Sequence, residues 1–329
     1  AGVADVAALT GDAAYIAAIG RIWDNVVAKK LYLTGGIGAR RHGEAFGDAY
    51  ELPNHSAYNE TCAAIANVLW NHRLFLLHGD AKYLDVLERT LYNGFLSGVG
   101  FDGTTYFYPN PLESDGLYAF NQGRISRQPW FDCACCPTNV VRFVASLPGY
   151  VYAQRENDIY VGLFIAGSAR LRLHDQPIVI TQETQYPWDG AVRIAVSPEA
   201  ATNFTLCIRI PGWVQGRPVP SDLYRYLDVA AEPVALSVNG EATPMFVEKG
   251  FARIARTWKA GDTVEVHFPM PIRRVLANEQ VADNRGKVAL ERGPLVYCAE
   301  LVDNGGRALN IILPDDAPLA TRQVPDLLR

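Results

Sequence analysis

Two adjacent cysteines, Cys135 and Cys136, stand where the sequence predicts the start of a helix. Pro137 follows them, as is common in a first helical turn, and apolar residues then recur at helical spacing as far as Leu147. This pattern predicts that Cys136 is the N-cap and that Cys135 lies just outside the helix. The N-terminus of a helix favours the thiolate form of cysteine, and adjacent cysteines rarely form a disulfide with each other. The pair therefore indicates soft-metal binding or catalysis.

Glu60 and Cys62 form a second group of candidate ligands. Because they are two residues apart, they would point to nearly opposite sides of a regular helix. They can converge only if Glu60 lies at the transition from loop to helix, where Ser56 and Asn59 are suitable caps. Together with the two adjacent cysteines they would supply one carboxylate and three thiolates, a set suited to tetrahedral zinc. The alternative is a solvent-facing glutamate and a buried cysteine.

Glu44 and the nearby aromatic residues are candidates for a different task. Glu44 lies in a loop rich in glycine and charge, where it is either a solvated surface acid or a general acid in catalysis. The aromatic residues at 106–108 and 130–131 either line a sugar-binding site or belong to the core. The sequence contains neither a Gly-x-Ser-x-Gly elbow nor a phosphate-binding loop.

All these candidates lie in the first 150 residues, where the apolar residues have helical periodicity. Helices are predicted over about 12–30 and 61–77, and a further one after Asp80. A Gly-Asp pair opens similar segments at Asp12 and Asp80, and in each an aromatic residue is predicted to be buried. This weak repeat favours stacked helical hairpins or a toroid.

After residue 150 the period of the apolar residues changes to two. Strands are predicted at 158–164, 177–181, 191–196, 204–210, 234–238, 251–255, 263–268 and 287–290, with a hairpin turn at Asn239-Gly240. Short strands with regular turns predict an antiparallel β-sandwich. We therefore predict a helical domain over 1–150, a β-sandwich domain over 151–275 and a C-terminal β-rich segment over 276–329.

The composition is that of a globular protein of about two domains. Of the 329 residues, 49% are hydrophobic and 20% charged, and the formal net charge of −5 leaves no basic surplus for binding nucleic acid. No apolar run approaches the ~20 residues of a membrane-spanning helix, and we find no signal peptide, so we expect no membrane partner and a cytoplasmic location. Cysteines stay reduced there, so clustering at 133–136 indicates metal binding or catalysis rather than a disulfide scaffold.

Several stretches, in this order and spacing, resemble glycoside hydrolase family 127, the zinc-dependent β-L-arabinofuranosidases. They are Gly43-Glu44-Ala45-Phe46, Glu51-Leu52-Pro53-Asn54, Tyr58-Asn59-Glu60-Thr61-Cys62-Ala63, Tyr108-Pro109-Asn110-Pro111-Leu112-Glu113 and Cys133-Ala134-Cys135-Cys136-Pro137-Thr138-Asn139. The resemblance covers roughly residues 31–150. Weaker motifs such as Ile210-Pro211-Gly212-Trp213 extend it into the β-rich remainder.

The resemblance implies an (α/α)6 barrel followed by β-sandwich domains. It also implies a retaining glycosidase that releases L-arabinofuranose from plant-derived arabinofuranosyl oligosaccharides or glycoconjugates. In such an enzyme Cys135 matches the nucleophile and Glu44 the general acid/base. The matched Zn²⁺ ligands are Glu60, Cys62, Cys135 and Cys136, and Tyr108 matches a tyrosine near the sugar.

Length is where the sequence departs from that family. Members are much longer, and this chain has no initiator methionine, so we expect it to carry the second half of the barrel and to have weak or no activity alone. Such a piece would expose an apolar face that favours aggregation or a homo-oligomer.

Two other functions compete with a glycosidase. One is a non-catalytic zinc-containing carbohydrate-binding or structural fragment, in which Glu44 would have no role. The other is a thiol redox protein that uses Cys133 and Cys135, which would form a reversible disulfide.

Overall fold

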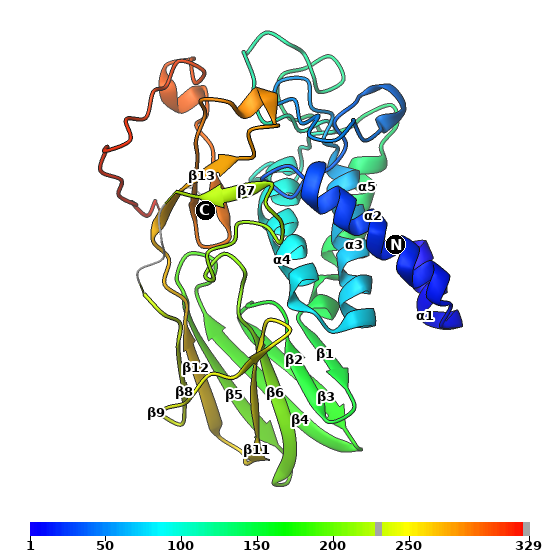
Figure 1. Cartoon of the computed structure of the whole chain (residues 1–329), viewed down its shortest axis with the longest axis vertical. Helices are drawn as coiled ribbons and strands as arrows, with labels where there is room; N and C mark the ends of the chain where they lie inside the picture. Colours follow the sequence, from blue (N-terminus) through cyan, green and yellow to red (C-terminus); the bar gives the residue numbers. More distant parts are fainter. Residues whose placement is uncertain (228–231, 325–329) are drawn as a thin grey trace.

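The computed structural model describes residues 1–227 and 232–324, with the long helices in the first 150 residues and the strands after them (Figure 1). The α-helices are α1 (Gly2–Thr10), α2 (Ala13–Lys29), α3 (Thr61–His78), α4 (Ala81–Arg89) and α5 (Cys135–Val144). Shorter turns are η1 (His42–Glu44), the π-turn η2 (Thr90–Phe95), η3 (Leu96–Gly98), η4 (Leu147–Tyr150), η5 (Ala282–Asn284) and η6 (Val302–Asn304). No helix within the described ranges combines the length and apolarity that a membrane crossing requires.

Two aspartates start the helices that the weak repeat predicts. Asp12 caps α2 and Asp80 caps α4, and each side chain accepts a hydrogen bond from the backbone N–H two residues later, at 2.8 and 2.9 Å. The shared buried aromatic is confirmed in one copy only, since Tyr83 is 5% exposed and Tyr15 is 46% exposed. Tyr15 lies outside the core because the buried stripe of α2 begins one turn later, at Ile19.

The strands form three sheets within the described residues. They are β1 (Tyr152–Arg155), β2 (Asp158–Val161), β3 (Gly167–Leu173), β4 (Gln176–Thr184), β5 (Ala191–Pro198), β6 (Thr202–Arg209), β7 (Tyr224–Tyr226), β8 (Ala235–Val238), β9 (Glu241–Ala242), β10 (Val247–Glu248), β11 (Phe251–Trp258), β12 (Asp262–His267), β13 (Ile272–Ala277), β14 (Ala289–Arg292) and β15 (Leu295–Tyr297). The sheet orders are β1-β2-β6-β11-β10, β3-β4-β5-β12-β8-β9 and β15-β14-β13-β7.

The first two sheets share one hydrophobic core, in which Ile159 and Leu206 of one sheet lie with Ile180 and Val264 of the other. The pairing is antiparallel as predicted, except that β2 and β6 run parallel. This exception arises because the chain leaves the first sheet after β2, forms β3 to β5 in the second, and returns beside β2 as β6. The predicted turn at Asn239-Gly240 is confirmed, because it joins β8 to β9 with positive φ at both residues, 52° and 83°.

Buried ion pairs join the helices to both groups of strands. Arg209 of β6 is fully buried and pairs with Asp85 and Glu88 of α4. Arg89, at the end of the same helix, pairs with Glu291 of β14. Glu291 also accepts a hydrogen bond from Tyr226 of β7, and Figure 1 shows β7 near α4. The last five residues of the predicted C-terminal segment 276–329 lie outside the described residues.

Candidate active site

The starts of α3 and α5, two helices that lie side by side, carry the predicted ligands (Figure 1). Glu60 is the N-cap of α3 and Cys62 lies in its first turn, while Cys135 and Cys136 begin α5. Glu60 therefore lies at the transition from loop to helix, as its convergence with Cys62 requires. One ligand atom from each of the four residues lies within 4.8 Å of the others. We call Glu60, Cys62, Cys135 and Cys136 the thiol cluster.

Both helix starts differ in detail from the predicted ones. Helix α5 begins at Cys135 with Ala134 as its N-cap, so the expectation that Cys136 is the cap is wrong. Neither of the residues predicted to cap α3 does so, because Glu60 occupies that position. Its side chain makes no capping hydrogen bond and instead turns to the thiols, with Oε1 3.3 Å from the Sγ of Cys136.

Cys135 lies among several polar groups of the thiol cluster and its surroundings. Its Sγ is 3.4 Å from Glu60 Oε1, 3.8 Å from Cys136 Sγ and 3.0 Å from Tyr108 Oη. Cys136 is fully buried and Glu60 is nearly so, whereas Cys62 and Cys135 are half-buried. The alternative of an isolated surface glutamate and a separate buried cysteine is therefore wrong.

The electrostatics of the thiol cluster indicate that it needs a cation to be fully ionised. Burial raises the pKa of Cys135 to about 12 and raises the pKa of Glu60. A hydrogen bond between Cys62 and Cys136 raises the pKa of Cys136 and lowers the pKa of Cys62. Ionisation of the Cys62 thiol therefore keeps the Cys136 thiol protonated. Burial thus opposes the thiolate form that a helix start favours. The four groups could hold a metal ion.

A tight loop scaffold presents Glu60 to the thiols. Asn59, which precedes it, has a left-handed backbone (φ 43°) and donates from Nδ2 to Asn110 O at 2.8 Å. Gly36 packs against this asparagine so closely that a Cβ there would lie 1.8 Å from Asn59 Oδ1. The N–H of Thr61 donates to Tyr108 O at 3.1 Å, which ties the start of α3 to the segment that carries Tyr108.

Glu44 and Tyr108 flank this scaffold. Glu44, in the exposed turn η1, accepts a hydrogen bond from Tyr58 Oη at 2.9 Å. The rings of Tyr58 and Tyr108 lie 6.2 Å apart between their centroids, and the Tyr108 ring also packs edge-on against Phe131. Burial is the largest cause that raises the pKa of Tyr58, and the hydrogen bond to Glu44 is the second. The Tyr58 phenol therefore stays protonated. A continuous row of side chains thus runs from Glu44 to Cys135.

Two members of the site carry no predicted role. Tyr58 appears in the sequence analysis only as the first residue of the stretch 58–63. Its position two residues before Glu60 is the one feature of the sequence that could have indicated a role in the site. Asn121 is fully buried and accepts from the N–H of Tyr108 at 2.8 Å, which fixes that residue's backbone. Asn121 lies in a long irregular loop where no periodicity marks buried positions, so the sequence gives no signal for it.

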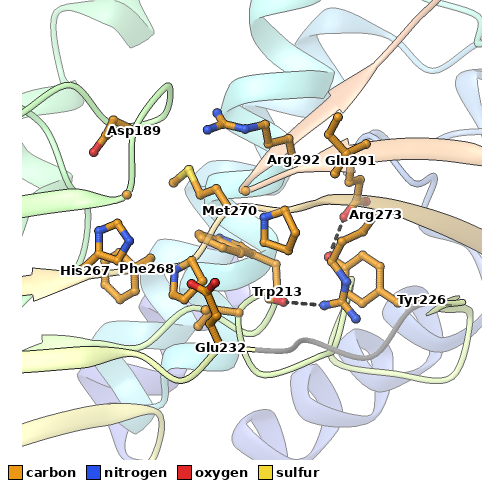
Figure 2. A pocket seen from close by; sticks show the side chains of 16 residues that line it. Asp189, Trp213, Tyr226, Glu232, His267, Phe268, Met270, Arg273, Glu291 and Arg292 are labelled. Carbon is orange, nitrogen blue, oxygen red and sulfur yellow. Dashed lines mark hydrogen bonds between the residues drawn. The ribbon is translucent and has the colours of Figure 1, made fainter. Parts of the chain in front are cut away.

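A separate cavity of about 380 Å³ lies near the junction of β12 and β13 (Figure 2). Its lining includes Asp189, Trp213, Tyr226, Met270 and Arg292. It contains none of the predicted site residues. Two of its charged groups are engaged within the protein: Glu291 binds Arg89 and Tyr226, and Arg292 donates to Trp188 O at 2.7 Å. The thiol cluster therefore remains the stronger candidate for the active site.

Comparison with known families matches nearly the whole chain. Residues 1–149 match a β-L-arabinofuranosidase GH127 catalytic domain, residues 158–270 the GH127 middle domain, and residues 272–327 the glycoside hydrolase family 127 C-terminal domain. A non-reducing end β-L-arabinofuranosidase of Bifidobacterium longum subsp. longum is 38% identical in an alignment of 325 positions that covers 95% of this chain and 46% of that protein.

Solved structures agree in fold. The GH127 β-arabinofuranosidase BT3674 is 57% identical with a TM-score of 0.88, over 92% of this chain and 46% of that one. A GH127 β-L-arabinofuranosidase from Geobacillus stearothermophilus T6 is 42% identical with a TM-score of 0.89, over 99% of this chain and 49% of that one. The chain thus spans about half the length of the relatives it matches.

Proposed function

The chain belongs to glycoside hydrolase family 127, and from this premise we propose that it is a retaining glycosidase that releases L-arabinofuranose from β-L-arabinofuranosides. The name of the Bifidobacterium relative supports this substrate class and points to non-reducing ends. Plant-derived arabinofuranosyl oligosaccharides and glycoconjugates are the substrates that carry such ends.

The observation that carries the proposal is the placement of the Cys135 sulfur. Of the two adjacent cysteines, Cys136 is fully buried, while Cys135 is half-buried and can be reached by a sugar. Its Sγ lies 3.0 Å from Tyr108 Oη, a group able to bind a sugar hydroxyl. We therefore assign Cys135 as the nucleophile, Glu44 as the acid/base and Tyr108 as a substrate-binding residue.

Zn²⁺ fits the thiol cluster better than a hard cation does, because three of the four ligands are sulfur. On a tetrahedron with bonds of about 2.3 Å to sulfur and about 2.0 Å to oxygen, two sulfurs are about 3.8 Å apart and a sulfur and an oxygen about 3.5 Å. The corresponding distances here are 3.8 Å between Cys135 and Cys136, and 3.3 and 3.4 Å from these sulfurs to Glu60 Oε1. When bound, zinc would keep the Cys135 sulfur as a thiolate at neutral pH.

The reaction then proceeds in two displacements. The Cys135 sulfur attacks the anomeric carbon as the bond to the leaving oxygen breaks, and protonated Glu44 gives its proton to that oxygen. Ionised Glu44 next takes a proton from water, whose oxygen attacks the same carbon and breaks the carbon–sulfur bond. Two inversions at one carbon give net retention of configuration.

The finer architecture and setting belong to the same proposal. We propose that the helices are part of an (α/α)6 barrel. We also propose that the first two sheets, which share a hydrophobic core, form the β-sandwich that follows the barrel. An exposed apolar stretch that includes Val3, Val6, Leu9 and Ile22 on α1 and α2 would be covered in a complete barrel or in a homo-oligomer. The free cysteines of the described chain suit the reducing cytoplasm.

The test compares Cys135→Ser with Cys133→Ser, a neighbouring exposed cysteine outside the thiol cluster. Hydrolysis of 4-nitrophenyl β-L-arabinofuranoside by the 329-residue chain is followed by absorbance, and the anomer first released by proton NMR. Because the chain alone is expected to be at most weakly active, we expect slow release of the β anomer by the parent chain and by Cys133→Ser, and no turnover from a folded Cys135→Ser.

Near-parental turnover by Cys135→Ser would overturn the nucleophile assignment. No release of arabinose by the parent chain, even under prolonged incubation with zinc, would overturn the activity. The remaining candidate would then be a non-catalytic zinc-containing protein that binds carbohydrate or serves as a structural unit, in which the thiol cluster would hold the metal.

A further inference from the structure

Glu44 lies on a loop that backbone hydrogen bonds close, and its side chain is exposed. Two backbone hydrogen bonds of 3.0 Å between Arg40 and Ala45 close the loop, and Gly43 and Glu44 both have positive φ, 70° and 49°. In residues 1–227 and 232–324, the one side chain that hydrogen-bonds to the carboxylate is Tyr58, whose Oη lies 2.9 Å from Oε1. The orientation of the Glu44 carboxylate therefore depends on this phenol.

Tyr58 belongs to the rigid scaffold that also positions the nucleophile. Its side chain is 6% exposed, its N–H donates to Ala39 O at 3.3 Å, and its carbonyl accepts from Asn110 N at 3.1 Å. The neighbouring ring of Tyr108 ends in the hydroxyl that lies 3.0 Å from Cys135 Sγ. A single pair of packed rings thus relates the position of the Glu44 carboxylate to that of the Cys135 sulfur.

We propose that Tyr58 is a positioning residue that holds Oε1 of Glu44 and leaves Oε2 as the oxygen that transfers the proton. This inference rests on the proposed function of Glu44. In the first step the Oε2–H bond breaks as the leaving oxygen gains the proton, the carbon–oxygen bond breaks and the carbon–sulfur bond forms. In the second step Oε2 receives a proton from water as the water oxygen bonds to the same carbon and the carbon–sulfur bond breaks, which returns the electron pair to the Cys135 sulfur. Oε1 keeps its hydrogen bond to Tyr58 in both steps.

The first experiment compares two substrates that differ in their leaving group, each hydrolysed by the full chain loaded with zinc. Methyl β-L-arabinofuranoside needs acid assistance to depart, whereas 4-nitrophenolate leaves without it. We expect Tyr58→Phe to lower kcat/KM about tenfold or more for the methyl glycoside and less than about threefold for the nitrophenyl glycoside. Tyr15→Phe, which removes the hydroxyl of an exposed tyrosine on α2, should leave both values unchanged.

Equal losses on the two glycosides would indicate a general structural role for Tyr58 and overturn the inference, as would no loss on either. If the parent chain hydrolyses neither glycoside, the proposed function fails, and crystal structures then test Tyr58 separately. We expect one position for the Glu44 carboxylate in the parent chain and loss of that position in Tyr58→Phe. An unchanged carboxylate in the variant would overturn the inference without turnover data.

Discussion

Replacement of Arg209 by methionine should strongly destabilise the chain. Arg209 is fully buried where β6 meets α4, and its guanidinium donates at 2.9 Å to Asp85, at a shorter distance to Glu88 and at 2.7 Å to Gly162 O. Methionine fills a similar volume but offers no donor. Arg209→Met therefore leaves Glu88, which is 1% exposed, and Asp85 without their cation.

Removal of one partner of a buried ion pair costs about 3–5 kcal/mol, because the remaining charge is neither paired nor hydrated. Arg209 pairs with two carboxylates, so we expect a loss in the free energy of unfolding at the upper end of that range. Urea denaturation followed by far-ultraviolet circular dichroism and by tryptophan fluorescence measures the loss, and agreement of the two probes shows whether helices and sheets unfold together.

Arg193→Met supplies the matched control. Arg193 lies on β5 with its side chain 43% exposed and pairs with Glu183 and Glu265, which are also exposed. Surface ion pairs contribute about 0–1 kcal/mol, so this variant should unfold nearly as the parent chain does. If Arg209→Met lowers the free energy of unfolding by less than about 1 kcal/mol, or by no more than Arg193→Met does, the argument that burial makes the loss of this cation costly is refuted.

Three further predictions follow from the same structure. Elemental analysis should find close to one zinc per chain, lost in Cys62→Ala but kept in Cys298→Ala; zinc retention by Cys62→Ala would contradict the ligand set. Burial lowers the pKa of His72 to about 4 from an ordinary value of about 6.5, so the folded state binds fewer protons than the unfolded state between these values. The free energy of unfolding therefore falls as the pH drops through that window. His72→Gln should flatten this fall in urea titrations at pH 7 and 5, and an unchanged slope would refute the assignment. Gly36→Ala should lower the free energy of unfolding by about 1–3 kcal/mol, because its Cβ would overlap the buried side chain of Asn59. Gly20→Ala, where a Cβ meets nothing within 4 Å, should instead stabilise α2 by about 0.5–1 kcal/mol. Equal thermal midpoints for the two variants would contradict this prediction.

The sequence was sufficient to predict the members of the thiol cluster but not its local geometry. Glu60 and Cys62 could be placed together because only a loop-to-helix transition allows residues two apart to converge, and the structure has that transition. The predicted cap of α5, Cys136, is two residues later than the observed cap, Ala134, because both residues precede the apolar periodicity that locates the helix. The bond from Tyr58 to Glu44 joins two loops, and no local pattern encodes such a contact.

The fold was predictable where side-chain periodicity is strong. Each predicted strand overlaps an observed one, because alternating apolar residues mark strands with one buried face, as in β5. Strand β3 was missed because its exposed residues weaken the alternation, and β10 because it is only two residues long. The parallel pairing of β2 with β6 depends on which sheet the intervening strands join, which is a tertiary choice. The three-part division of the chain remains a prediction.

The most direct test of the central claim is to trap the sugar on the nucleophile. In Glu44→Gln, departure of 4-nitrophenolate needs no acid, but hydrolysis of the glycosyl-enzyme lacks its base, so the adduct should accumulate. Intact-protein mass spectrometry followed by peptide mapping should find one arabinofuranosyl group on Cys135. An adduct on another residue, or none while nitrophenol is released, would contradict a cysteine nucleophile.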